Sequence, residues 1–238
     1  MSCRAILCVC VGLALSTSGC FWNAPLLTGS GTLVTETHSA EDFDALAVES
    51  AYDVTARSGK EYAVEVTADD NVMEYVSVQQ NGSQLKLGLS QPLRLQGVTL
   101  RAEITVPTLR SVDVGGASQV RINGIECSEL ELDLSGASQI QGQLFASDLH
   151  VDLSGASKVQ LSGQCDHLAV DASGASSANL EELVSESSSI DASGASQVHI
   201  HTRGELIADV SGASKLTHNQ EAEIGRVETS GASSMSQR

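Results

Sequence analysis

The chain has 238 residues, a formal net charge of −17 and an aromatic content of only 3%. So acidic a surface repels phosphate backbones, which argues against nucleic acid as a partner and disfavours anionic lipid headgroups. Because aromatic side chains are scarce, the core has to be built from Val, Leu, Ile and Ala, a composition that suits thin repeated layers.

The first 20 residues have the pattern of a bacterial export signal. Arg4 precedes an apolar run of 11 residues, which is the length of a signal-peptide core and too short to span a bilayer. The segment TSGC, which ends at Cys20, resembles the lipoprotein cleavage box, although threonine stands where leucine is usual. We expect a signal peptide at residues 1–19 and a lipid such as palmitate on Cys20. The alternative is an ordinary secretory signal with an incidental cysteine.

The residue after Cys20 indicates the membrane to which the protein is sorted. Phe21 rather than Asp follows the cysteine, which by resemblance to Gram-negative lipoproteins favours the outer membrane, with the protein facing the periplasm or the cell surface. Residues 20–31 are expected to be a tether. No later apolar run approaches the ~20 residues that a membrane helix needs, so the lipid is the predicted membrane anchor.

Residues 32–110 show the two-residue alternation of strands, with no repeat. Asn81-Gly82 lies between two alternating runs, which predicts a hairpin. The segment DDNVMEYV, beginning at Asp69, predicts a short helical turn. We therefore expect a β-rich, partly antiparallel N-terminal portion that caps the repeats which follow it.

Residues 111–238 repeat the phrase D-x-S-G-A-S. Its glycines are Gly116, Gly136, Gly155, Gly174, Gly194, Gly212 and Gly231. Their spacing stays between 18 and 20 residues, and a constant period means that each repeat is one unit stacked on the next. The predicted fold is all-β: a parallel β-helix, or solenoid, with about 19 residues per coil. Right-handed winding is favoured because parallel crossovers prefer that hand.

The repeated phrase predicts a tight corner in every coil. Glycine supplies a backbone conformation or a close approach that side chains resist. The alanine after it is expected to point inward, where stacked corners leave little room. The serines on either side are expected to form hydrogen-bonded ladders, or else a flat polar strip on the surface.

One acidic residue of each repeat should form a column on the outer surface. The predicted column contains Asp113, Asp133, Asp152, Asp171, Asp191 and Asp209, with Glu228 in the last copy. Carboxylates stacked ~5 Å apart repel by about 0.8 kcal/mol per pair even in water. Each side chain is expected to offset this by capping N–H groups of its own corner; the alternative is divalent cations such as Ca²⁺ held between coils.

Two further sets of residues have side chains that can bind metals or form disulfides. His199 and His201 alternate around one residue and should share a face, and Glu181 one coil earlier could join them as a zinc or copper ligand. Two exposed histidines on a strand are more often incidental, so no metal site is assigned. Cys127 and Cys165 fall in one column two coils apart, too far for a disulfide, which predicts two free and mostly buried thiols.

Several segments together resemble a known family. They are FDALAV from Phe43, ADDN from Ala68, VPTL from Val106 and the repeated S-G-A-S. On these residues the chain resembles the bacterial head GIN domain family of autotransporter adhesins. The resemblance implies a β-helix and an adhesive role. It brings no catalytic residues, so none is carried over.

The expected function is therefore non-catalytic. The solenoid surface is predicted to bind a glycan or an envelope protein, with no cofactor. The first alternative is a Ca²⁺-binding module that uses the aspartate column. An enzyme acting on polysaccharide is disfavoured because the repeats lack a basic cluster. The exposed end of a solenoid also suggests an end-to-end homodimer.

Overall fold

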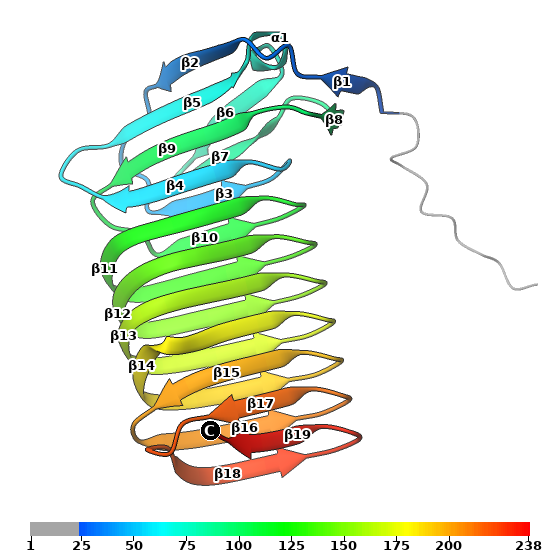
Figure 1. Ribbon diagram of the computed structural model, residues 1–238. Helices are drawn as coiled ribbons and strands as arrows, with labels where there is room; N and C mark the ends of the chain where they lie inside the picture. The colour runs from blue at the N-terminus through cyan, green and yellow to red at the C-terminus, as the bar shows by residue number, and fades with distance from the viewer. Residues whose placement is uncertain (1–23) are drawn as a thin grey trace, which may run out of the picture.

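A computed structural model describes residues 24–238, so the predicted signal peptide and Cys20 lie outside the described residues. Figure 1 shows a stack of flattened coils, each with a pointed turn at one edge and a smooth bend at the other. One 17-stranded sheet winds through the stack, and a separate two-stranded sheet lies at the N-terminal end.

The solenoid is built from parallel strands. They are β10 (Ser111–Val114), β11 (Gln119–Leu134), β12 (Gln139–Leu153), β13 (Lys158–Ala172), β14 (Ser177–Ala192), β15 (Gln197–Thr202), β16 (Glu205–Val210), β17 (Lys215–His218), β18 (Glu223–Thr229) and β19 (Ser234–Gln237). Each strand pairs with its equivalent one coil further on. The period of about 19 residues and the all-β solenoid predicted from it are thus confirmed; the right-handed winding stays a prediction.

The N-terminal portion is β-rich and partly antiparallel, as predicted. Its elements are β1 (Leu26–Thr28), β2 (Leu33–His38), β3 (Ala45–Val48), β4 (Asp53–Ser58), β5 (Ala63–Asp69), α1 (Asp70–Met73), β6 (Val76–Asn81), β7 (Gln84–Leu89), β8 (Arg94–Gln96) and β9 (Leu100–Val106). β6 and β7 form the predicted hairpin, and α1 is the predicted helical turn. In the part of the chain that the structure describes, no helix has the length and apolar character needed to cross a membrane.

The solenoid begins one coil before the first repeat. β3 pairs in parallel with β10, and β4 pairs in parallel with β11. The turn between β3 and β4 replaces the S-G-A-S corner, and its Ser50 and Ala51 both have positive φ angles of 69° and 64°. The N-terminal portion therefore contributes a coil of its own as well as covering the end of the stack.

The interior of each coil is filled by aliphatic side chains on the inward positions. Leu130, Leu132 and Leu134 of β11 are fully buried, and the residues between them are exposed. The next coils place Leu149, Val151 and Leu153 at the same positions through the ladder register. This is the two-residue period of a strand with one face on the core.

The corner explains why every repeat needs glycine. Gly155 has φ +71°, and a Cβ there would lie 2.6 Å from the carbonyl oxygen of Gly136 in the previous coil. That same carbonyl accepts a hydrogen bond of 2.8 Å from the N–H of Ala156. A side chain at the glycine would thus displace the backbone bond that stacks one corner on the next.

The prediction for the corner alanine was wrong, because alanine and serine have exchanged roles. Ala156 is exposed, whereas Ser157 is fully buried. The Ser157 Oγ donates a hydrogen bond of 2.9 Å to the carbonyl of Ser154 and so is satisfied inside the turn. Ser176 and Ser196 make the equivalent bond in their coils. In these coils the buried hydroxyl closes the turn, whereas the Oγ atoms of Ser118 and Ser138 have no hydrogen-bond partner.

Candidate functional site

The acidic residues form the column predicted from the sequence. The register pairs Asp113 with Asp133, Asp133 with Asp152 and so on down the stack to Glu228. All of these side chains are exposed. Whether this aspartate column as a whole binds cations stays a prediction.

The expected capping of the corners by the aspartates was wrong. The corner N–H groups donate to carbonyls of the previous coil: Ser135 to Val114 at 3.0 Å and Ala137 to Gly116 at 2.8 Å. Stacking has already satisfied these donors, so the carboxylates have no corner bonds to offset their mutual repulsion. Partial burial, then neighbouring carboxylates, raise the pKa of Asp113 and Asp191 above the ordinary value.

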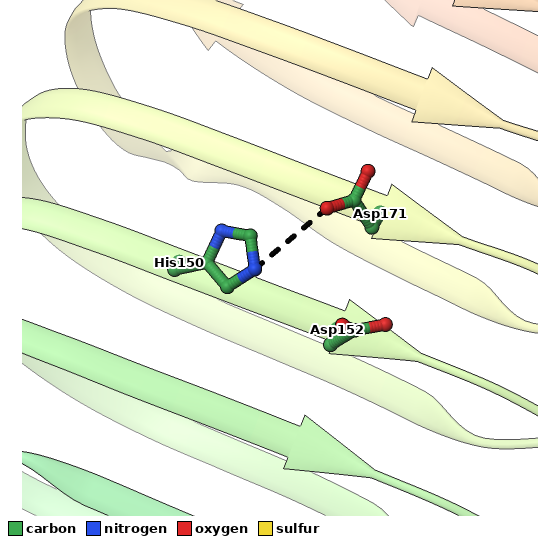
Figure 2. Close-up of side chains that lie close together, drawn as sticks. All are labelled: His150, Asp152 and Asp171. Carbon is green, nitrogen blue, oxygen red and sulfur yellow. Dashed lines mark ion pairs between the residues drawn. The ribbon is translucent and has the colours of Figure 1, made fainter.

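One histidine stands beside the aspartate column at its middle. Figure 2 shows His150 of β12 with its ring leaning toward Asp171 of β13, while Asp152 lies two residues further along β12. His150 Nε2 lies 3.7 Å from Asp171 Oδ2. One donor atom from each of the three side chains lies within 4.8 Å of the other two. We call this group the His150 cluster. It was not predicted from the sequence, because the aspartates were compared only with one another and not with the outward residues two positions before them.

A hollow of about 440 Å³ lies in the same face of the solenoid. Its walls include His150, His167 and Ile207. In the outward column next to the aspartates, the small residues Ala169 and Ser189 lie between His150 and Ile207. Their short side chains leave the hollow between these two larger residues. Aligning the repeats by column would have shown this run of small side chains.

The face on the other side of the corners is mostly uncharged. Its register stacks two rows, Arg121–Gln141–Gln160–Asn179 and Asn123–Gln143–Ser162–Glu182. We call these eight residues the amide face. A groove of about 350 Å³ runs over the rows. At its floor Gly142 has φ +149°, and a Cβ there would lie 1.9 Å from the carbonyl oxygen of Ile122, so only glycine fits.

The weak candidate set of His199, His201 and Glu181 is only partly brought together: Glu181 and His201 line one hollow, but the three donor atoms do not lie within 4.8 Å of one another. Glu181 lies in a bulge, and the register places Val184 rather than Glu181 beside His201. His199 Nδ1 lies 3.4 Å from Glu181 Oε1 without forming a hydrogen bond, while His201 is next to Glu221 at 3.7 Å. The irregular register moved Glu181 out of the column that the residue count had predicted.

The two cysteines are free thiols, as predicted. Both pair in the ladder with Ala146, so the coil that contains Ala146 lies between them. Cys165 is fully buried and Cys127 is half-buried. Burial, with smaller contributions from Asp166 and Asp148, raises the pKa of Cys165 to about 12, and burial also raises the pKa of Cys127.

The solenoid with its S-G-A-S corners defines the class of protein. Residues 42–221 match the sequence profile of the family described as "Putative auto-transporter adhesin, head GIN domain". Because the match covers most of the chain, the chain belongs to this family. The match confirms the resemblance seen in the sequence. No curated protein matches the chain in sequence.

Solved structures share the fold. A "putative adhesin" from Bacteroides fragilis has a TM-score of 0.84 at 18% identity, over 89% of this chain and 100% of that one. A "putative adhesin" from Parabacteroides merdae gives 0.69 at 17% identity, over 90% and 100% of the two chains. A "putative lipid binding protein" from Parabacteroides distasonis gives 0.68 at 16% identity, over 89% and 99%. At these identities the likeness concerns the fold.

Proposed function

We propose that this chain is a non-catalytic cell-envelope protein, held by a lipid on Cys20, whose amide face binds a neutral, hydroxyl-rich glycan. The export signal predicted from the sequence supports the location in the cell envelope, and membership of an adhesin family supports the adhesive role. The family description names no reaction. The lipid places the solenoid at a membrane surface, where contacts with other surfaces are made.

The observation that carries the glycan proposal is the groove over the amide face. A primary amide offers two donors and one acceptor, so stacked amides present a periodic set of both for sugar hydroxyls. The rows repeat at the strand spacing of about 4.8 Å, which is rigid because the backbone ladder fixes it. A rigid donor and acceptor array loses little conformational entropy on binding.

The charge distribution supports a neutral ligand. The aspartate column faces away from the groove, and the groove itself has one basic and one acidic residue, Arg121 and Glu182. Arg121 is already paired with Asp53. A polyanion would find no net positive surface, whereas a neutral glycan needs none.

The test is a glycan array probed with the purified protein, with and without calcium. We expect neutral glycans to bind, and the double variant Gln141→Ala, Gln160→Ala to lose at least tenfold in affinity. Gln164→Ala is the matched control, because Gln164 is exposed and does not line the groove. Equal binding by the double variant and the control, or no glycan bound in either condition, would overturn the proposal and favour a protein partner.

A further inference from the structure

The His150 cluster differs from the rest of the aspartate column in its donor chemistry. The outward residues next to the column are Ser111, Glu131, His150, Ala169, Ser189 and Ile207. One of these positions is a histidine, so one pair of adjacent coils combines an imidazole with two carboxylates. In the part of the chain that the structure describes, no other group of three His, Cys, Asp or Glu side chains brings its donor atoms so close together.

The ladder register holds the cluster in place. Asp152 and Asp171 are direct neighbours across β12 and β13, and both point outward. His150 pairs in the ladder with Ala169, whose side chain is only a methyl group. The imidazole leans toward Asp171, as Figure 2 shows. All three ligand positions are therefore fixed by paired strands rather than by a loop.

We propose that His150, Asp152 and Asp171 bind one Zn²⁺ ion on the outer face of the solenoid. Imidazole with carboxylates suits zinc and its neighbours in the first transition row, whereas calcium takes six to eight oxygen ligands. Three protein ligands leave a fourth position, which water fills. The site is independent of the amide face and of any glycan.

The distances agree with a zinc site that is open before the ion arrives. Ligand atoms held at about 2.0–2.2 Å from a tetrahedral ion lie about 3.3–3.6 Å apart. His150 Nε2 and Asp171 Oδ2 are already 3.7 Å apart. The three donor atoms all lie within 4.8 Å of one another, and both carboxylates are exposed, so side-chain rotation can bring them to an ion.

Electrostatics also favours a cation at this place. Asp152 and Asp171 are direct neighbours in a line of carboxylates that continues to Asp133 on one side and Asp191 on the other. At the corner that follows each of these aspartates, the N–H groups of the serine before the glycine and of the alanine after it are bonded to the previous coil and do not neutralise the carboxylates. A divalent ion between the two central carboxylates replaces repulsion by attraction.

The test is a titration of the purified protein with Zn²⁺ alone, followed by calorimetry. We expect one binding event that His150→Gln and Asp171→Asn each weaken at least tenfold. Asp191→Asn is the matched control: it removes a carboxylate of the same column whose neighbour is Ser189 instead of a histidine, and we expect less than a threefold change. His199→Gln, on another face, controls for incidental histidine binding.

Two further readouts separate the site from other sources of binding. Co²⁺ in place of Zn²⁺ should give the weak visible bands of nitrogen and oxygen ligands, without the intense near-ultraviolet band of thiolates, which excludes the cysteines. Circular dichroism of each variant should match the parent protein. Zinc binding that His150→Gln leaves unchanged, or that Asp191→Asn weakens as much as Asp171→Asn, would overturn the proposal, as would no binding at 100-fold molar excess. A glycan result of either sign leaves this test unaffected.

Discussion

Asp69 is the residue that ties the N-terminal portion together. Its side chain is buried, with 1% exposed, at the end of β5. One carboxylate oxygen accepts the N–H of Gly31 at 2.7 Å, and the other accepts the N–H of Thr99 at 2.7 Å. These bonds, led by the one from Thr99, hold the pKa of Asp69 below its ordinary value of 3.8. The carboxylate thus joins two segments that are far apart in the sequence.

Asp69→Asn should destabilise the protein at neutral pH by several degrees in melting temperature. The amide keeps one acceptor but turns its NH₂ group toward the second N–H donor. Because the folded pKa is depressed, the stability that the carboxylate contributes is present above pH 3.8 and is lost as pH falls through the folded pKa. The difference between variant and parent should therefore shrink below pH 3.8, as thermal melts from pH 7 to pH 3 would show.

Asp70→Asn is the control for this prediction, since Asp70 is an exposed carboxylate next in sequence. If both variants melt alike at pH 7, the buried bonds of Asp69 do not stabilise the fold as argued. This role could not be predicted from the sequence. The segment DDNV predicts the helical turn, but the partners of Asp69 are brought to it by the antiparallel pairing of distant strands.

The two cysteines should differ in reactivity toward a thiol reagent at pH 8. Cys165 is fully buried with a pKa raised to about 12, so almost no thiolate forms and the reagent has no access. Cys127 is half-buried and should react at least tenfold faster. Mass spectrometry of the peptides that contain each residue measures both rates. Equal rates in the folded protein would mean that the coil opens at Cys165.

At the scale of the element, the corner decides whether coils stack. Gly155→Ala would place a methyl group 2.6 Å from the Gly136 carbonyl at a φ of +71°. The left-handed conformation costs a non-glycine residue about 1–2 kcal/mol, and displacing a stacked backbone adds roughly as much again through a lost hydrogen bond. We expect a loss of about 2–4 kcal/mol in the free energy of unfolding, measured by denaturant titration.

Gly124→Ala isolates the conformational part of that cost. Gly124 has φ +65°, but a Cβ there has nothing within 4 Å. This variant should lose about 1–2 kcal/mol, the cost of the backbone conformation alone. A loss as large as that of Gly155→Ala would show that stacking adds nothing to the glycine requirement.

The repeat made most of each coil predictable. A strict period fixed the strands, the aspartate column and the need for glycine, because every copy obeys the same stacking constraint. Where the period is broken, prediction failed: the bulge between Leu180 and Val184 moved Glu181 away from His201. Alternation also could not tell which of Ala156 and Ser157 turns inward at the corner, since the chain there leaves the extended conformation on which the two-residue period depends.

At the scale of the molecule, charge is distributed by face. One face carries the aspartate column through the repeats, from Asp113 to Glu228, and the face with the groove is nearly neutral. When the seven repeats stack, residues at equivalent positions lie directly above one another. One aspartate per repeat therefore forms a line of negative charge along the solenoid. The sequence predicted this column; it did not predict the amide face, whose residues vary from coil to coil and become a surface only when the register is known.

The column should make stability depend on salt. Neighbouring carboxylates lie about 4.8 Å apart, well inside the screening length of about 30 Å at 0.01 M salt but not inside that of about 3 Å at 1 M. Replacing Asp113 and Asp191 by Asn should therefore stabilise the metal-free protein at low salt. After solvent screening we expect roughly a few tenths of a kcal/mol per carboxylate, or about 2 °C in melting temperature for the pair.

The pH dependence of the same variant follows from the raised pKa values of both residues. An acid whose folded pKa is raised destabilises the fold when it ionises, so its cost is absent at low pH and grows as pH rises from the unfolded value through the folded one. Thermal melts with EDTA at pH 7 and pH 3, in 10 mM and 1 M NaCl, should show the variant more stable in one condition, pH 7 with low salt. A variant less stable than the parent there would mean that these carboxylates make favourable contacts that outweigh their repulsion.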